Sequence, residues 1–137
     1  MPSSEPLEFR PDALFFRRIP KGTWSAREER PFKNQFELRP GESGLSVFDA
    51  SRCRQSDVIG AFPGWGLTQW IFEELVEFGF AVFECEDDEG LPPALRNAHF
   101  EIRVRDLPVG SLSGRYQRSL SVLAARRMLR LPDEKAP

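Results

Sequence analysis

One histidine and a nearby glutamate form the first pair of side chains in this sequence that could support proton-transfer chemistry. His99 is the only histidine in the 137 residues, and Glu101 follows two positions later. Residues i and i+2 of a strand point to the same side, about 7 Å apart. Both side chains could therefore contact one bound ligand. The alternative is a surface or capping histidine with no chemical role.

Three tryptophans add aromatic rings that could stack on a ligand. Trp24 lies in a polar, charged stretch, so it is a candidate for ring stacking, although it could equally pack that stretch against the core. Trp65 lies in a Phe-Pro-Gly-Trp-Gly turn and is expected to be exposed. Trp70 precedes an apolar stripe and is expected in the core.

Several signatures of well-known chemistry are missing from the sequence. It has no P-loop, no GxGxxG after a strand, no GxSxG, no HExxH and no Cys/His cluster. We therefore expect no metal site. Cys53 and Cys85 lie far apart without metal-ligand spacing, so neither a disulfide nor a paired metal ligand is expected, and a reducing compartment is the simplest interpretation.

Hydrophobic patterns in the first half predict two strands that would carry part of this chemistry. Ala13–Ile19 is apolar and bounded by prolines, which favours a strand. Lys21–Pro40 shows no sustained period and is expected to be a long loop. Gly44–Ala50 alternates like a second strand. Ser51 is expected to cap a helix that runs to about Ala61.

The second half is expected to alternate between helices and strands. A helix stripe follows Thr68, which is expected to be its cap, and Gly79 is expected to end it. The remaining predicted elements, in chain order, are a strand at Phe80–Glu86, a loop at Asp87–Asn97, a strand at Ala98–Arg105 and a helix at about Arg115–Leu131.

Charged residues on two of these elements have more than one interpretation. The strand Ala98–Arg105 would place His99, Glu101, Arg103 and Arg105 on one face. For Arg103 and Arg105 we expect a solvated face on which Glu84 and Glu86 of a neighbouring strand pair with them, whereas His99 and Glu101 are excepted from this interpretation. On the last helix, Arg127 falls within the apolar face, where it either reaches water or meets a carboxylate of this chain or of a partner.

Composition favours one globular domain over residues 1–137, with flexible ends at 1–11 and 132–137. Hydrophobic residues make up 40% of the chain, and the formal charge is −2 from 19 basic and 21 acidic residues. This balance disfavours nucleic acid as a partner. No apolar run reaches the length of a membrane span, and the start does not resemble a secretion signal, so we expect a cytoplasmic protein. Short mixed elements predict the α+β class.

Three short segments, read in order, carry a family resemblance. They are the aromatic-Arg strand at Phe15–Arg17, the Gly-x-Ser-Val-Phe-Asp segment at Gly44–Asp49 and the Ala-His-aromatic segment at Ala98–Phe100. Together they resemble small ADP-ribosyltransferase-like bacterial toxins delivered by the type VI secretion system. The chain also resembles small bacterial proteins that share an Arg-Arg-Ile-Pro start and an Ala-His strand.

The resemblance implies a compact split β-sheet with a cleft for NAD, which would be the substrate. It implies that Arg17 holds the pyrophosphate, that Ser46 braces the strand beside the nicotinamide ribose, and that His99 or Glu101 orients or stabilises that ribose. The family has a Glu-x-Glu late in the chain, whereas Glu84-Cys85-Glu86 precedes the Ala-His strand here. His99-Phe100-Glu101 is therefore taken as its substitute.

Two classes of function follow. The first is an NAD-dependent ADP-ribosyltransferase or NAD glycohydrolase that acts as a toxin and is held in check by an immunity protein or antitoxin. In it, His99, Glu101 and Ser46 are candidate catalytic residues, and Arg17 and Trp24 are candidate NAD-binding residues. The second is a non-enzymatic interaction module, an antitoxin, immunity protein or complex subunit, that uses the Arg-rich C-terminal helix or the acidic run from Glu84.

Overall fold

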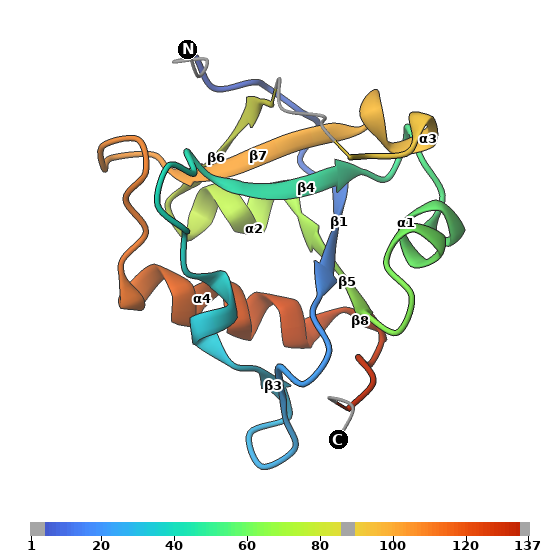
Figure 1. Cartoon of the computed structure of the whole chain (residues 1–137). Coiled ribbons are helices and arrows are strands. Elements are labelled where there is room, and N and C mark those ends of the chain that lie inside the picture. The colour runs from blue at the N-terminus through green and yellow to red at the C-terminus, as the bar shows by residue number, and fades with distance from the viewer. Residues whose placement is uncertain (1–4, 86–89, 135–137) are drawn as a thin grey trace.

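An antiparallel sheet with helices packed on it forms the body of the protein. The structure is a computed structural model, and it describes residues 5–85 and 90–134. Within these ranges, six strands form one sheet in the order β6-β7-β4-β1-β5-β8 (Figure 1). The predicted α+β class is confirmed. The strands are β1 (Leu14–Ile19), β4 (Leu45–Asp49), β5 (Gly66–Ile71), β6 (Phe80–Glu84), β7 (His99–Val104) and β8 (Met128–Arg130).

The other elements cover the sheet or flank it. A short hairpin, β2–β3, and the 3-10 helix η1 lie in the long segment between β1 and β4. The bounds are β2 (Trp24–Ser25), β3 (Arg30–Pro31), η1 (Lys33–Phe36), α1 (Gln55–Ala61), α2 (Phe72–Glu77), α3 (Pro93–Arg96) and α4 (Gly114–Arg126).

Strand alternation sends apolar side chains to both faces of the sheet. One face, with Phe15 and Val47, packs against α2, α4 and η1 and forms the larger core. The opposite face, with Phe16 and Phe48, packs against α1 and α3 and forms a smaller one. Both faces of the central strands are thus withdrawn from water, which explains the apolar composition of β1 and β4.

The sheet divides between β1 and β4. β1 pairs with β5 at six positions, but it pairs with β4 only at Phe15–Asp49 and Phe16–Phe48. Beyond Phe16, the Arg17 Nη1 donates a hydrogen bond of 2.7 Å to the backbone oxygen of Ser46. In Figure 1, β4 and β7 run across the upper part of the view, whereas β1 runs downward from them. The structure shows an open antiparallel sheet, and its likeness to an ADP-ribosyltransferase fold stays a prediction.

The segment Gly66–Ile71 is strand β5, so the prediction that Thr68 caps a helix was wrong. Thr68 is fully buried, and its Oγ1 donates a hydrogen bond of 2.6 Å to the Ala124 oxygen. Strand alternation places Leu67 and Ile71 on one face of β5 and Trp70 on the other. Pairing with β1 and β8 provides hydrogen-bond partners for the backbone of β5. The helix that follows, α2, is correspondingly shorter than predicted.

The C-terminal helix also ends earlier than predicted, at Arg126. Arg127 has φ −136°, and β8 then pairs with β5 in the register Leu67–Arg130. Sheet pairing at this edge is a tertiary contact that helix periodicity does not reveal. Of the alternatives for Arg127, the intramolecular one holds, because its guanidinium is ion-paired with Glu74 of α2.

Two predicted loops contain short elements, and one predicted cap is misplaced. The segment Lys21–Pro40 holds the hairpin and η1, and Asp87–Asn97 holds α3, although its residues 87–89, like Glu86, lie outside the described part of the chain. α1 begins at Gln55 instead of following Ser51. The Arg54 backbone N–H there donates a hydrogen bond of 2.8 Å to the Asp57 carboxylate.

Candidate functional site

A small polar pocket lies where β1 and β4 part. Its volume is about 180 Å³. Side chains of β1, of β4, of the segment from η1 to residue 42 and of the turn before β5 line it. They are Arg17, Arg18, Pro20, Gln35, Glu37, Arg39, Glu42, Leu45, Ser46 and Trp65. Three arginines and two glutamates give this lining a formal charge of +1, which suits an anionic ligand.

Arg17 is the most unusual group in the pocket because it is a buried cation without a carboxylate partner among the described residues. It is only 7% exposed. Its Nη1 is bonded to the Ser46 oxygen, but its Nε has no hydrogen-bond partner in the described part of the chain. Burial, and then the neighbouring charge of Arg18, lower its pKa to about 9, while Glu42 acts in the opposite direction. At pH 7 the guanidinium stays charged.

Gln35 places a second unsatisfied group in the same pocket. Both Nε2 and Oε1 of its amide are buried without a hydrogen-bond partner within residues 5–85 and 90–134. A buried polar group left in this state costs about 1–3 kcal/mol. The amide offers a donor and an acceptor side by side, so a ligand with an amide or nucleobase edge could satisfy both.

Arg18 supplies a second guanidinium that aromatic rings hold in place. Its Cζ lies 4.4 Å from the centre of the Phe62 ring and 5.6 Å from that of Trp65. Burial lowers the pKa of Arg18, Glu42 raises it, and Arg39 lowers it further. Trp65 is half-buried by this stacking, so its predicted exposure is only partly realised.

Ser46 and His99 are in direct contact on neighbouring strands. The Ser46 Oγ lies 3.0 Å from the His99 Nε2. His99 is 7% exposed, and its ring lies against Phe48, with 5.5 Å between the ring centres. Ser46, in contrast, is half-buried and lines the pocket. The pair thus joins a shielded imidazole to a hydroxyl that a ligand can reach.

Glu101 is buried, and so is Arg103, for which the prediction of a solvated position was wrong. The two carboxylate oxygens of Glu101 accept hydrogen bonds of 2.9 and 2.7 Å from the Ser43 hydroxyl, and Oε2 lies 2.7 Å from the Arg103 Nε. Arg103 also lies over the Phe83 ring, 4.0 Å from its centre. Glu101 and Arg103 can be buried because they form an ion pair and because the Phe83 ring stacks on the guanidinium. The alternation of the strand does not reveal these contacts.

The register between β6 and β7 does not place Glu84 opposite Arg103 or Arg105. The two strands are neighbours, but their register places Glu84 opposite Phe100 and Arg103 opposite Ala81. Arg105 is exposed, and Glu86 lies outside the described residues. The register follows from the Phe80–Val104 pairing at the other end of the ladder, which the sequence pattern does not specify.

Of the five predicted site residues, the structure brings Arg17, Ser46 and His99 together by direct contact. His99 reaches the pocket only through Ser46 and does not line it. Glu101 is the cross-strand neighbour of Ser46, and it does not line the pocket either. Trp24 belongs to the β2–β3 hairpin and does not line the pocket either.

Sequence reasoning missed most of the polar pocket lining. The polar and charged residues missed are Arg18, Gln35, Glu37, Arg39 and Glu42. Arg18 follows Arg17 directly, so the repeated arginine before Pro20 was an available signal. The others come from η1 and the segment that follows it, whose course no periodic pattern predicts.

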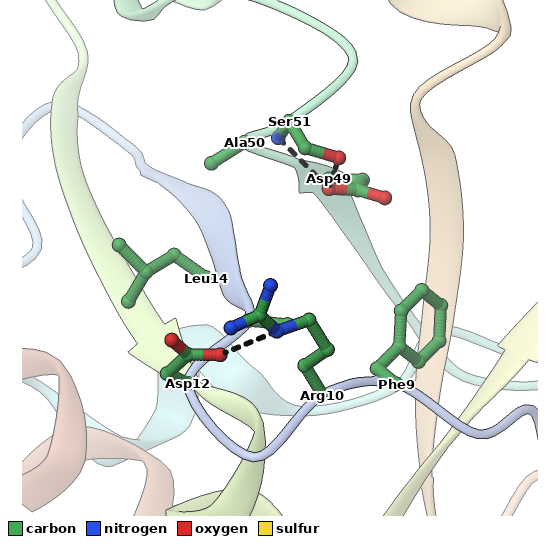
Figure 2. Close-up of a pocket in the computed structure, with 8 residues that line it drawn as sticks. Phe9, Arg10, Asp12, Leu14, Asp49, Ala50 and Ser51 are labelled. Carbon is green, nitrogen blue, oxygen red and sulfur yellow. Dashed lines mark hydrogen bonds and ion pairs between the residues drawn. The ribbon is translucent and has the colours of Figure 1, made fainter.

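A larger hollow lies at the other end of β1 and β4, with a volume of about 430 Å³. Figure 2 shows Asp49 and Ser51 on one side and the Arg10–Asp12 ion pair on the other. The Asp49 Oδ1 already accepts hydrogen bonds from the Ser51 backbone N–H and hydroxyl, at 2.9 and 2.8 Å. None of its lining side chains is a buried polar group without a partner, so the Arg17 pocket is the stronger candidate.

Comparisons with protein-family models, with curated proteins and with solved structures gave no match. In the described ranges, no three or more His, Cys, Asp and Glu side chains are grouped so that they could hold a metal ion. None of the helices in those ranges has the length and apolar character needed to cross a membrane.

Proposed function

We propose that the Arg17 pocket binds NAD and that the protein cleaves its bond between nicotinamide and ribose, as a transferase or a glycohydrolase. The observation that carries this proposal is the buried Arg17 guanidinium, with one N–H unpartnered in the described structure, beside the equally unsatisfied Gln35 amide. Native proteins rarely leave such groups without a partner, and a ligand with phosphate and amide groups would satisfy both.

The arginines would bind the pyrophosphate of NAD. Guanidinium groups bind phosphate oxygens through paired, charge-assisted hydrogen bonds. Arg18 is held by aromatic rings and Arg17 by the sheet, so little side-chain entropy would be lost on binding. The carboxamide of the nicotinamide would be the partner for Gln35.

A carboxylate of the pocket would stabilise the reacting ribose. As the C1′–N bond breaks, its electron pair goes to the pyridinium nitrogen, and positive charge develops on the ribose. Glu101 is bonded to Ser43 and Arg103 and does not line the pocket. Glu42 lines the pocket, and its Oε1 accepts a hydrogen bond of 2.6 Å from the Arg39 backbone N–H. We therefore assign this role to Glu42, with Ser46 and His99 beside the ribose. Water or an acceptor group then bonds to C1′.

Release of nicotinamide from NAD by the purified protein tests this proposal. The wild type should release nicotinamide. Glu42→Gln, which keeps the size of the side chain and removes its charge, should lower the rate about 100-fold or more. Glu73→Gln, a helix-surface substitution outside the pocket, is the matched control and should leave the rate unchanged. No release by the wild type, or equal rates in Glu42→Gln, would contradict the proposal.

A toxin of this kind should arrest the growth of a bacterium that expresses it, with loss of NAD or modification of a protein. The expected partner is an immunity protein or antitoxin that covers the pocket. Wild type and His99→Ala should be followed together for growth and total NAD. Arrest by both variants would contradict a role for His99, and normal growth with steady NAD in both would favour the second candidate function.

The second candidate is a protein-interaction module, and one surface feature favours it. A hollow of about 340 Å³ beside α4 is lined by Arg30, Lys33 and Arg118, by Phe32, which is 46% exposed, and by Glu28, which is ion-paired with Arg30. A basic hollow with an exposed aromatic ring suits an acidic peptide segment. Arg126 and Arg127 at the end of the helix are paired with Glu74, so the interaction would use the first half of α4.

A further inference from the structure

We infer that Ser46 is a nucleophile activated by His99, and that the pocket accepts a carboxylic ester that carries an anionic group. The proposed hydrolysis of such an ester goes beyond NAD cleavage and does not depend on it. The inference starts from the 3.0 Å contact between the Ser46 Oγ and the His99 Nε2 at the edge of an arginine-lined pocket. A serine hydroxyl within hydrogen-bond reach of a histidine is the pairing that nucleophilic catalysis requires.

The strands hold this pair rigidly. Ser46 is on β4 and His99 on β7, and the register pairs their neighbours, Phe48 with His99 and Ser46 with Glu101. Both side chains therefore point to the same face of the sheet, and Phe48 supports the imidazole ring. A site built on paired strands keeps its geometry better than one built on loops.

The same face brings a cation to the serine. Arg18 and Ser46 each lie two residues beyond the Phe16–Phe48 pair on their strands, so strand alternation places them on the same side of the sheet. Both line the pocket. The guanidinium of Arg18 can hold an anionic group of the substrate or the oxyanion that develops during attack.

The reaction balances with water as the only co-reactant. The Ser46 Oγ forms a bond to the acyl carbon as its proton moves to the His99 Nε2. The bond to the alcohol then breaks, and the alcohol leaves with that proton. Water attacks the acyl-serine, gives a proton to His99, and the acid is released as Ser46 regains its proton.

Three other candidate nucleophiles flank β4, and each is engaged elsewhere or protonated. The hydroxyls of Ser43 and Ser51 donate to the carboxylates of Glu101 and Asp49. Burial raises the pKa of the Cys53 thiol to about 11, so it is protonated at neutral pH. With one histidine in the chain, Ser46 is the serine that a histidine base serves.

A fluorophosphonate probe tests this assignment without NAD. Attack on phosphorus forms an Oγ–P bond and expels fluoride, and peptide mass spectrometry locates the product. We expect one label on the wild type, at Ser46, and none on Ser46→Ala. Ser119→Ala, which removes a serine on α4 that is half-buried like Ser46, is the matched control and should label like the wild type.

His99→Gln separates base catalysis from mere exposure of the serine. The glutamine keeps a polar partner for Ser46 but cannot take its proton, so labelling should slow about 100-fold or more. Inorganic phosphate should slow wild-type labelling by occupying the arginines. Labelling at another residue, no labelling of the wild type, or an unchanged rate in folded His99→Gln would overturn the inference, whatever the outcome with NAD. If His99→Gln does not fold, the position of the label on the wild type and its protection by phosphate decide whether the inference holds.

Discussion

The charge of Arg17 contributes little to the stability of the fold, which is typical of a residue that binds a ligand. Arg17 is buried, it donates to one backbone oxygen, and no carboxylate is bonded to it among the described residues. Desolvation lowers its pKa, which means that the folded state disfavours its charged form. Arg103 shows the opposite situation, because its guanidinium is paired with Glu101.

Replacing Arg17 with methionine should leave the stability of the protein unchanged or raise it by about 1 kcal/mol. An apolar chain of similar volume removes a desolvated charge without leaving a carboxylate unpaired. Urea unfolding followed by circular dichroism measures the change. Arg103→Met is the matched control and should destabilise by about 3–5 kcal/mol, because Glu101 would remain buried without its partner. Equal losses in both variants would assign Arg17 a structural role.

Cys53 should react slowly with alkylating reagents, since it stays protonated in the folded protein. Burial, Asp57 and Asp49 raise its pKa to about 11, in that order of effect. At pH 8 about one thiol in a thousand is then ionised, and only the thiolate reacts. Peptide mass spectrometry after iodoacetamide treatment measures the rate. We expect the rate to rise with pH up to about 11 and to be much faster in urea. Fast reaction of the folded protein at pH 8 would contradict this environment.

At the scale of elements, the sequence predicted best where a segment carries its own pattern. The strands at β1, β4, β6 and β7 agree with the predicted ranges within the described residues. β5 and β8 were missed because their pairing at the far side of the sheet outweighs the local signals for a turn and for a continuing helix. Such tertiary contacts are not encoded in the period of one segment.

Alanine substitutions at two glycines test the packing around β5 and α1. A methyl group on Gly66 would lie 2.7 Å from Pro132 and 2.8 Å from the Arg130 oxygen, so Gly66→Ala should destabilise by about 1–3 kcal/mol. Gly60 is in α1 with open space around it, and Gly60→Ala should stabilise by about 0.5–1 kcal/mol. Thermal unfolding of both variants measures these effects, and a stable Gly66→Ala would mean that β8 does not pack there.

At the scale of the whole molecule, the candidate site is a product of topology. Arg17, Ser46 and His99 are up to 82 positions apart in the chain, and the strand order β7-β4-β1 makes them neighbours. The ordered motifs singled out these residues, but nothing in their spacing gave the Ser46–His99 contact or the burial of Glu101. Gln35 reaches the pocket from the short helix η1 and Glu42 from the segment between η1 and β4, and neither position follows from a periodic pattern in the sequence.

Calorimetric titration with ADP-ribose tests the central claim, that the Arg17 pocket binds the phosphates of NAD, most directly. ADP-ribose carries the pyrophosphate but no nicotinamide bond, so binding is measured without turnover. We expect one site per chain. The Kd should rise about tenfold or more in Arg17→Lys, because lysine keeps the charge but cannot form the paired hydrogen bonds of the planar guanidinium. The Kd should not change in the control variant Arg118→Lys. No binding to the wild type, or the same Kd in Arg17→Lys, would contradict the claim.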